Sequence, residues 1–417
     1  MKFSFMRNVD DHAGMFIGIL LGKMAQIKNL IYPTKREIYP EKVKTILCQK
    51  YFGMGSILMT LPLINGLRRK YPNAKIVFLT LESNRELLKI CKMADEVLTI
   101  NLRSFPLLMK DVFLRLVRLL GYRIDISIDL EFYSNFSMLI SFLTLAKVRV
   151  GLHQKYIRPD GLITSEIYYN YYKHITEIYF AYARVLGIEA KPEYFNSLLP
   201  SMRKSREPEL RRKLNLKHDI PIILINVNAS DLFIFRCWPA DYFVALVRRL
   251  IKNYPDNYYI LIGGKSDREY VDNIYKQIGE NEQLINSAGQ TDLKELFGLV
   301  EMSSLMITND SGPMHIASLY GKNIAVFFGP ETPVVYGPLN ENVIVFYSGE
   351  MYCSPCLNVY DSKQSLYKET CKENNCLKAL KPDYVYSLIE EKFLSGKSIL
   401  ENREIDKIKD NLKCIKY

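Results

Sequence analysis

Short apolar runs alternate with helix-spaced apolar patterns along most of this chain, and a Gly-containing turn often separates the two. For example, the apolar run 45–49 leads to Gly53-Met54-Gly55-Ser56, and apolar residues at helical spacing follow over 57–67. Strands that alternate with helices pair in parallel and are covered on both faces. The pattern therefore predicts an α/β fold, with ligands bound in the loops that follow the strands.

The pattern stops and restarts once, which divides the 417 residues into two halves. Residues 191–208 contain three prolines and several charges but no long apolar run, so we expect the interdomain linker there. We predict an N-terminal extension at 1–42, either poorly ordered or docked. Two Rossmann-like domains at 43–200 and 201–382 and a helical tail at 383–417 complete the division.

The net charge is +11, from 56 Lys and Arg against 45 Asp and Glu. This excess indicates an anionic partner, such as a phospholipid or a phosphorylated small molecule. Nucleic acid is not expected, because the basic residues are dispersed and no nucleic-acid motif accompanies them. The basic and apolar segment 103–123 suits a membrane surface or an anionic acceptor, and an ordinary amphipathic packing helix is the alternative.

No targeting or membrane-spanning segment is expected. The apolar stretch 14–21 is too short to span a bilayer and lacks a cleavage motif of small residues. We therefore expect a cytoplasmic protein, with peripheral binding at the inner face of the membrane as a further expectation.

The segment Asn309-Asp310-Ser311-Gly312-Pro313-Met314-His315 carries the most chemical information. A strand gives way to a helix at Ser311 and Gly312, where free N–H groups and the helix dipole attract an anion. His315 falls in the first helical turn and could face the same ligand. The alternative is a capped helix start with a surface histidine.

The only tryptophan follows an arginine, in Arg236-Cys237-Trp238-Pro239. An arginine at a helix start, after the polar loop that contains Asn228 and Ser230, suits a phosphate oxygen. The alternative is a surface arginine beside a core tryptophan.

Two carboxylates, Asp129 and Glu131, lie at the end of a predicted strand. A carboxylate in that place can act as a general base, and a helix N-cap or loop acid is the alternative. The turn at Gly53, Gly55 and Ser56 lacks the third glycine of a dinucleotide fingerprint, so it is weak evidence for nucleotide binding, and we expect it to be a loop on the acceptor side.

Four cysteines have the spacing of a metal site: Cys353, Cys356, Cys371 and Cys376. A Cys-x-x-Cys pair and a second pair can complete a tetrahedral set of thiolates. We expect an insertion at 353–376 that binds a structural metal.

Taken together, these motifs resemble glycosyltransferase family 9, the heptosyltransferase family. The resemblance covers roughly residues 43–385 and includes Phe328-Gly329-Pro330 and Gly337-Pro338. It implies the GT-B architecture, with two Rossmann-like domains whose parallel sheets face each other across a cleft. It also implies an inverting transfer of heptose from ADP-heptose to an anionic glycolipid or glycan such as the lipopolysaccharide core, without a catalytic metal. One branch of the family carries a four-cysteine iron site, so the structural ion would be zinc or iron.

The resemblance also implies roles for individual residues. The donor-binding set is Arg236, Asn228, Ser230, Gly263, Gly264, Asp310, Ser311, Gly312 and His315. Many family members have an aspartate, the proposed base, where this chain has Ser56, and an unaided hydroxyl is a poor base. Asp129 and Glu131 are therefore the candidate bases. A nucleotide-sugar epimerase of the same architecture, or a catalytically weak sugar-nucleotide-binding protein, are the alternatives.

Overall fold

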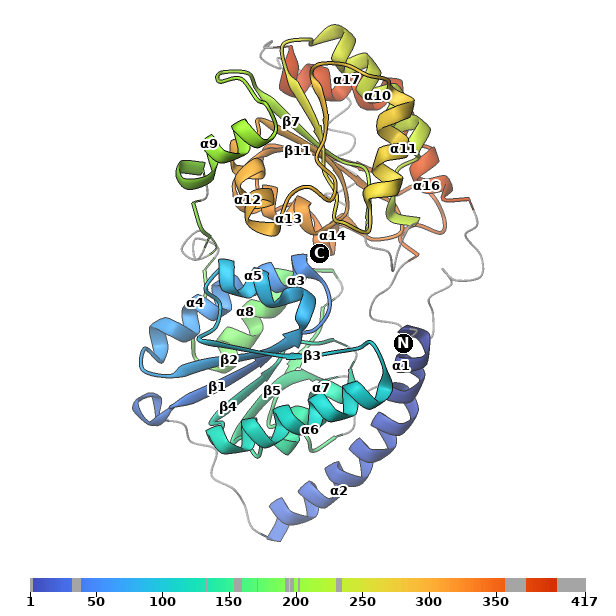
Figure 1. Cartoon of the computed structure of the whole chain (residues 1–417). Helices are drawn as coiled ribbons and strands as arrows, with labels where there is room; N and C mark the ends of the chain where they lie inside the picture. Colours follow the sequence, from blue (N-terminus) through green and yellow to red (C-terminus); the bar gives the residue numbers. More distant parts are fainter. Residues whose placement is uncertain are drawn as a thin grey trace. The chain divides into compact units, whose positions relative to one another are not determined.

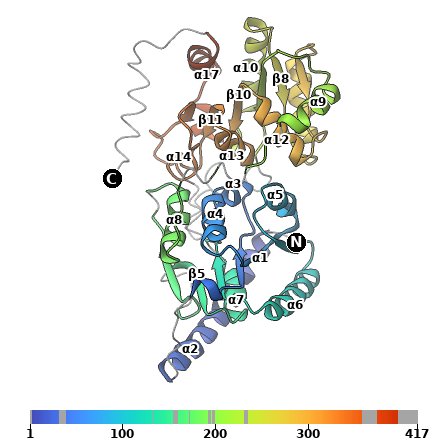
Figure 2. The ribbon, with the colours of Figure 1, turned by 90° about the vertical axis from the view of Figure 1, so that its left-hand side faces the viewer.

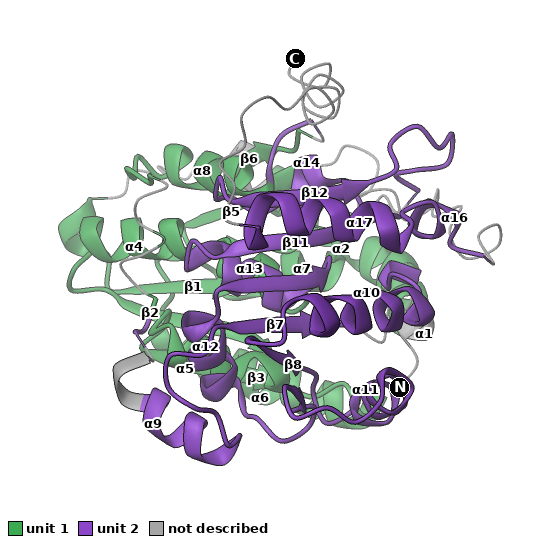
Figure 3. Ribbon diagram, turned by 90° about the horizontal axis from the view of Figure 1, so that it is seen from above, with its two compact units in different colours: residues 1–170, 175–199 green, residues 171–174, 200–417 purple. Residues whose placement is uncertain are grey.

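A computed structural model describes residues 3–31, 39–132, 134–153, 160–170, 172–191, 195, 199–201, 203–229, 235–356 and 373–395. The chain divides into two compact units, coloured separately in Figure 3. Unit 1 comprises Met1–Asn170 and Ile175–Leu199, and unit 2 comprises Tyr171–His174 and Pro200–Tyr417.

Unit 1 is a parallel six-stranded sheet with the order β3-β2-β1-β4-β5-β6 (Figure 1). Its strands are β1 (Thr45–Gln49), β2 (Lys75–Leu81), β3 (Glu96–Ile100), β4 (Ile126–Asp129), β5 (Val148–His153) and β6 (Ser165–Tyr168). Its helices are α1 (Phe3–Val9), η1 (Asp10–Gly14), α2 (Met15–Ile31), η2 (Pro40–Lys42), α3 (Met54–Leu58), α4 (Leu61–Lys70), η3 (Glu82–Asn84), α5 (Arg85–Ile90), α6 (Phe105–Tyr122), α7 (Asn135–Leu143) and α8 (Ile175–Val185).

Helices cover both faces of the unit 1 sheet. Helices α4 and α8 lie together on one face, while α6 and α7 lie on the other (Figure 1 and Figure 2). One apolar cluster joins the second layer to the strands and includes Leu47 of β1, Leu119 of α6 and Ile140 of α7. The buried five-residue strand β1 matches the near-continuous apolar run expected of a central parallel strand.

The described part of the N-terminal extension is helical and docks on unit 1. The carboxylate of Asp10 accepts hydrogen bonds from the backbone N–H groups of Asn135, at 2.9 Å, and Phe136, at 2.7 Å. These N–H groups are unpaired within α7 because they belong to its first turn, so Asp10 satisfies them as a capping residue would.

Unit 2 repeats the same topology, with the strand order β12-β11-β10-β7-β8-β9. Its strands are β7 (Ile222–Asn226), β8 (Tyr258–Leu261), β9 (Leu284–Asn286), β10 (Leu305–Asn309), β11 (Asn323–Phe328) and β12 (Val343–Tyr347). Its helices are α9 (Arg203–Lys213), α10 (Ala240–Asn253), α11 (Arg268–Ile278), α12 (Leu293–Met302), α13 (Gly312–Leu319), α14 (Pro333–Tyr336), α16 (Asn375–Lys378), α17 (Pro382–Ile389) and η6 (Glu390–Leu394).

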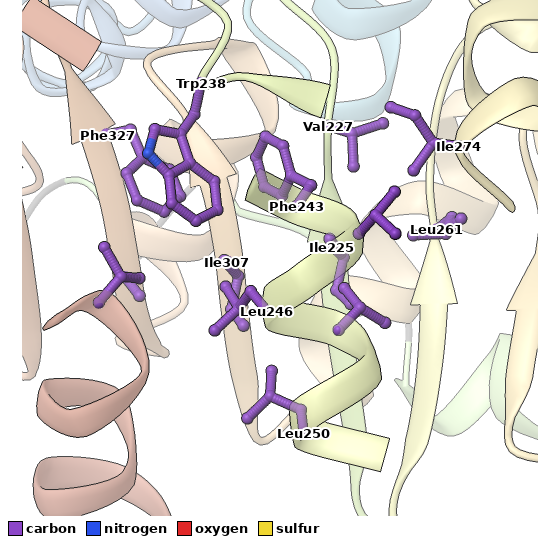
Figure 4. Packing of buried hydrophobic residues seen from close by; sticks show 14 of the residues in the cluster. Ile225, Val227, Trp238, Phe243, Leu246, Leu250, Leu261, Ile274, Ile307 and Phe327 are labelled. Atoms are coloured by element: carbon purple, nitrogen blue, oxygen red, sulfur yellow. The ribbon is translucent and has the colours of Figure 1, made fainter. Parts of the chain in front are cut away.

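Trp238 forms the centre of an aromatic group in the core of unit 2 (Figure 4). Its ring stacks on Phe327 with 4.3 Å between the centroids, and Phe243 meets it edge-on at 4.9 Å. The indole N–H donates to the carbonyl of Leu380 at 2.9 Å. The single tryptophan is therefore a core residue that fixes the loop before α10.

The strand–helix alternation confirms the predicted α/β class, and the structure refines the predicted boundaries. Helix α9 begins at Arg203 and contains Pro208, so the second part of the segment 191–208 is helical rather than an irregular linker. The helix is held by packing on α12, where the ammonium of Lys213 bonds both carboxylate oxygens of Glu295, at 2.7 and 2.8 Å.

Within the described ranges, no helix combines the length and the apolar character needed to cross a bilayer.

Candidate functional site

Each sheet reverses its direction of strand addition at one place. In unit 2 this place lies between β7 and β10, where Thr308 stands opposite Asn226. In unit 1 it lies between β1 and β4, where Asp129 stands opposite Gln49. Ligands of doubly wound folds bind outside the carboxyl ends of the strands at such a point. Both groups of predicted site residues follow these strands.

Asn226, the last residue of β7, organises the unit 2 site. Its side-chain amide donates to the Ser311 hydroxyl at 2.8 Å and to the Thr308 hydroxyl at 3.1 Å. It also donates to the carbonyl of Asn228 at 3.1 Å. A second amide, Asn309, accepts the backbone N–H of Trp238 at 2.8 Å. These contacts tie the loops after β7 and β10 and the Arg-x-Trp-Pro segment together.

The first turn of α13 is not capped by its own N-cap side chain. Ser311 is the N-cap residue, but its hydroxyl contacts Asn226 and donates to the carbonyl of Asn309 at 3.0 Å. The structure therefore contradicts the alternative that Ser311 caps this helix with its side chain. The N–H groups at the start of a helix carry partial positive charge and suit an anion.

Arg236 lies between two buried acids. Its guanidinium is 3.2 Å from a carboxylate oxygen of Glu331 and 3.5 Å from one of Asp310. Burial raises the pKa of Asp310, although Arg236 opposes the shift. Burial likewise raises the pKa of Glu331 to about 8, with Arg236 again opposing and Asp310 adding to the shift. At neutral pH Glu331 is therefore mostly protonated and does not neutralise the charge of Arg236.

His315 is buried, not on the surface, with 5% of its area exposed. Its Nδ1 atom has no hydrogen-bond partner in the described part of the chain. Burial, together with the nearby His174 and Arg236, lowers its pKa to about 3. His174 bonds the carbonyl of Gly337 at 3.0 Å, and burial lowers its pKa to about 4. Both rings are neutral at physiological pH.

The remaining predicted donor residues are placed as follows. Gly263 lies just after β8, where an added Cβ would come within 3.2 Å of both Asp267 and Val271, so only glycine packs there without a shift. The N–H of Gly264 donates to the carboxylate of Asp267 at 2.8 Å. Gly312 is the first residue of α13. Asn228 Oδ1 is buried without a hydrogen-bond partner among the described residues, and Ser230 lies outside them.

In unit 1 the turn after β1 is held by Glu131. One carboxylate oxygen accepts the N–H groups of Tyr51, at 2.5 Å, and Phe52, at 2.9 Å. The other is 3.7 Å from the ammonium of Lys50, which is itself buried. Burial lowers the pKa of Lys50, while Glu131 and Asp129 oppose that shift. Glu131 thus fixes the turn that leads to Gly53, Gly55 and Ser56.

Asp129 ends β4 and is 1% exposed. One of its carboxylate oxygens accepts the backbone N–H of Glu131 at 3.1 Å. The tyrosine hydroxyl of Tyr182 fixes the backbone by donating to the Asp129 carbonyl at 2.7 Å. Gly53 has φ +83°, a left-handed conformation that favours glycine and turns the chain into α3.

The structure describes three of the four predicted metal ligands: Cys353 is exposed, Cys356 is half-buried and Cys376 is buried. Cys371 lies outside the described residues. Cys356 and Cys376 both act electrostatically on Tyr347. Within the described residues, no three His, Cys, Asp or Glu side chains form a group that could hold a metal ion.

Residues of these sites that were not singled out from the sequence include Lys50, His174, Asn226 and Glu331. Glu331 directly follows the Gly329-Pro330 turn after β11, so the rule that site residues follow strands could have found it. Lys50 likewise directly follows β1. His174 gives no such signal, since it belongs to a short segment that crosses to unit 2 between two parts of unit 1.

Two Rossmann-like parallel sheets with the same strand order define an α/β protein of the GT-B class. Residues 114–367, more than half of the chain, match glycosyltransferase family 9 (heptosyltransferase), and the chain belongs to that family. The resemblance seen in the motifs is confirmed.

Relatives of the chain carry the same family description. Lipooligosaccharide heptosyltransferase 2 of Campylobacter jejuni is 31% identical over 129 residues, which are 30% of this chain and 35% of that protein. The match thus spans about a third of that relative. Lipopolysaccharide heptosyltransferase 3 of Escherichia coli K12 is 25% identical over 314 residues, 74% of this chain and 89% of the relative. The solved E. coli ADP-heptose lps heptosyltransferase II has a TM-score of 0.65 and 19% identity, and the match covers 85% of this chain and all of that one.

Proposed function

We propose that this protein is an inverting glycosyltransferase of lipopolysaccharide core assembly, which moves heptose from ADP-heptose to an anionic glycolipid acceptor. The family membership supports a glycosyltransferase, and the names of the similar proteins support the sugar and the pathway. The observation that carries the proposal is the anion site of unit 2, where the uncapped start of α13 and Arg236 adjoin the buried His315.

The chemistry of that site suits a departing diphosphate. When the bond between the sugar and the diphosphate breaks, negative charge develops on the leaving oxygen. Arg236 and the N–H groups at the start of α13 would stabilise it, because preorganised donors act most strongly where charge develops. Neutral His315 could donate one hydrogen bond to the same group, and protonated Glu331 would not repel it.

The acceptor hydroxyl requires a base, which we assign to Asp129. Glu131 is the weaker candidate, because its oxygens already hold two N–H groups and face Lys50. Asp129 is also buried, so the reaction requires a local opening around it before the acceptor reaches it. In this assignment Glu131 is a positioning residue.

Donor binding and transfer test the proposal separately. Calorimetry with ADP-heptose, a UDP-sugar and a GDP-sugar should give binding of ADP-heptose alone. Arg236→Gln should weaken that binding by roughly tenfold or more, as expected for a charge-assisted contact to phosphate. The matched control is Arg212→Gln, an exposed arginine of the same unit. Tight binding of a UDP-sugar and none of ADP-heptose would refute the donor.

Transfer to lipopolysaccharide core acceptors should fall by orders of magnitude in Asp129→Asn, while ADP-heptose affinity stays unchanged. Full turnover in Asp129→Asn would refute the base. Conversion of the donor without any acceptor would instead indicate an epimerase. Donor binding without transfer to any core acceptor would indicate a binding protein.

We also propose that the four cysteines hold a structural zinc or iron ion. The thiolate set suits either metal, and a closed four-sulfur site stabilises the fold rather than the reaction. Elemental analysis of the purified chain should find close to one equivalent of metal, reduced in Cys353→Ser. A metal-free wild-type protein prepared without chelators would contradict this proposal.

A further inference from the structure

Two helices of unit 1 carry just over half of the large hydrophobic side chains that are exposed in the described part of the chain. Of the twenty-four large hydrophobic side chains that are exposed within the described ranges, thirteen belong to α2 and α6. Both helices lie on the same side of the unit 1 sheet, and α7 lies between them (Figure 1 and Figure 2). Exposed apolar side chains concentrated on two helices in this way mark an interaction site.

The helix α2 is turned so that its small residues face the protein. Gly14 at the end of η1 and Gly18 and Gly22 of α2 are spaced four apart, and Gly18 and Gly22 are buried. An added Cβ on Gly14 would lie 3.0 Å from the Cβ of Asn135, and one on Gly22 would lie 2.1 Å from the carbonyl oxygen of Asp160. The large apolar residues therefore point away from unit 1. An ordinary amphipathic helix would bury them.

The outer stripe of α2 consists of Phe16, Leu20, Met24 and Ile27, between 54% and 71% exposed. Their spacing of four, four and three residues keeps them on one face of a helix.

Helix α6 shows the same spacing on its outer side. Its inner side packs on the core of unit 1 through Leu119, with Leu108 and Val112 beside it. The outer stripe consists of Met109, Phe113, Val117 and Leu120, between 42% and 67% exposed. The packing-helix alternative therefore accounts for only one side of α6.

The charged residues within the two helices are mainly positive. Helix α2 contains no acidic residue, and its Lys23 is exposed. On α6, Lys110 is exposed, and the exposed Arg103 and Arg123 lie just before and just after the helix. The one acid of α6, Asp111, accepts the backbone N–H of Asn101 at 3.0 Å. An apolar stripe with basic residues around it is complementary to an anionic lipid surface.

We propose that the outer stripes of α2 and α6 form a membrane-binding face, by which unit 1 lies on a bilayer of anionic phospholipid. The face lies on the bilayer rather than spanning it, because α2 has 17 residues, about 25 Å at 1.5 Å per residue. The side of α2 that carries the glycines is moreover occupied by the protein. The apolar side chains enter the boundary between head groups and acyl chains, and the lysines and arginines contact the phosphates. This inference does not depend on the proposed function, since binding to lipid needs no donor or acceptor.

Vesicle co-sedimentation of the full chain tests the membrane-binding face. Vesicles with equal parts of phosphatidylglycerol and phosphatidylcholine should bind the protein roughly tenfold more tightly than vesicles of phosphatidylcholine alone, and added salt should weaken binding. Phe16→Gln combined with Phe113→Gln should reduce binding to the anionic vesicles by roughly tenfold or more.

The matched control is Val185→Gln combined with Leu339→Gln, which changes two exposed apolar residues outside α2 and α6. It should bind the anionic vesicles as the wild type does. Absence of wild-type binding to either vesicle, or equal binding by the Phe16/Phe113 variant, would overturn the proposal. Light scattering that finds a dimeric wild type and a monomeric Phe16/Phe113 variant would also overturn it, since a second copy would then cover the face.

Discussion

In the proposed donor site, the protonation of Glu331 should determine how much positive charge Arg236 offers to a diphosphate. The Glu331 pKa of about 8, raised by burial, means that this residue loses its proton just above physiological pH. The carboxylate then pairs with Arg236, 3.2 Å away, and repels an anionic ligand. We expect the affinity for ADP to fall as the pH rises above about 8, by up to roughly tenfold per pH unit, as linkage to one proton requires.

Calorimetric titration with ADP at several pH values, on wild type and Glu331→Gln, measures this effect. The variant cannot ionise at that position, so its affinity should stay nearly constant where that of the wild type falls. Glu341→Gln changes an exposed acid of the same unit and should behave as the wild type does. Parallel curves for wild type and Glu331→Gln would show that another group titrates.

His174 and His315 should make the fold sensitive to acid. Their pKa values of about 4 and about 3 in the folded protein lie below the ordinary 6.5. At pH values between the folded and the ordinary pKa, the unfolded chain therefore binds more protons than the folded chain. The free energy of unfolding therefore falls as the pH falls below about 6.5, by about 1.4 kcal/mol per pH unit for each histidine. Glu331 opposes this trend over part of the range. Because its pKa is raised in the folded protein, its protonation stabilises the fold as the pH falls.

Comparison with a variant isolates the contribution of one ring. His174→Gln can keep the hydrogen bond to the Gly337 carbonyl but cannot bind a proton. Urea unfolding between about pH 4.5 and pH 6.5 should show a pH dependence that is shallower than that of the wild type by about 1.4 kcal/mol per unit. His218→Gln, an exposed position, should leave the dependence unchanged. Equal slopes for wild type and His174→Gln would contradict the burial of a neutral ring.

At the scale of elements, the glycine at position 22 decides how α2 docks. In Gly22→Ala the new Cβ would come 2.1 Å from the backbone carbonyl oxygen of Asp160, which cannot move as a side chain does. We expect a loss of about 1–3 kcal/mol in the free energy of unfolding, as in other overpacked contacts, despite the better helix propensity of alanine. Thermal unfolding measures it.

Gly121→Ala is the matched control, since Gly121 also lies in a helix but an added Cβ meets no atom within 4 Å. The free energy of unfolding of that variant should rise by up to about 1 kcal/mol, because only the higher helix propensity of alanine acts there. The two substitutions should thus have opposite signs. A loss in both, or in neither, would mean that α2 is not packed through Gly22.

The elements themselves could largely be predicted, because an apolar run or a helical spacing is a local property. The position of Ser311 and Gly312 at a strand-to-helix turn could be predicted in the same way, because an apolar run and a helical pattern lie on either side of them. The orientation of α2 could not be predicted, since a search for the apolar face places Phe16 and Leu20 inward, whereas the glycines face the protein. The start of α9 was missed because Pro208 suggested a break, while packing on α12 outweighs that preference.

At the scale of the whole molecule, the electrostatics of the site depend on pairs that no local pattern reveals. Arg236 meets Glu331 from 95 positions away, and His174 reaches the His315 region from another part of the chain. The sequence identified Arg236 and His315 as chemically suited to phosphate, but not the partners that set their charge. Similarly, Glu131 was predicted as a base, and only its contacts with Tyr51 and Phe52 show that it holds a turn.

The two units have separate apolar cores, one around Trp238 and one around Leu47 and Leu119. Calorimetry should therefore resolve two unfolding transitions, and only that of unit 2 should respond to ADP, because the proposed donor site lies there. At a ligand concentration of a hundred times the dissociation constant, binding stabilises the folded state by about 2.7 kcal/mol. For a unit of this size that corresponds to a rise of about 5–10 °C in one transition. Arg236→Gln should reduce the rise without moving the other transition. A rise of equal size in both transitions would show that ADP also binds unit 1 or that the units unfold together.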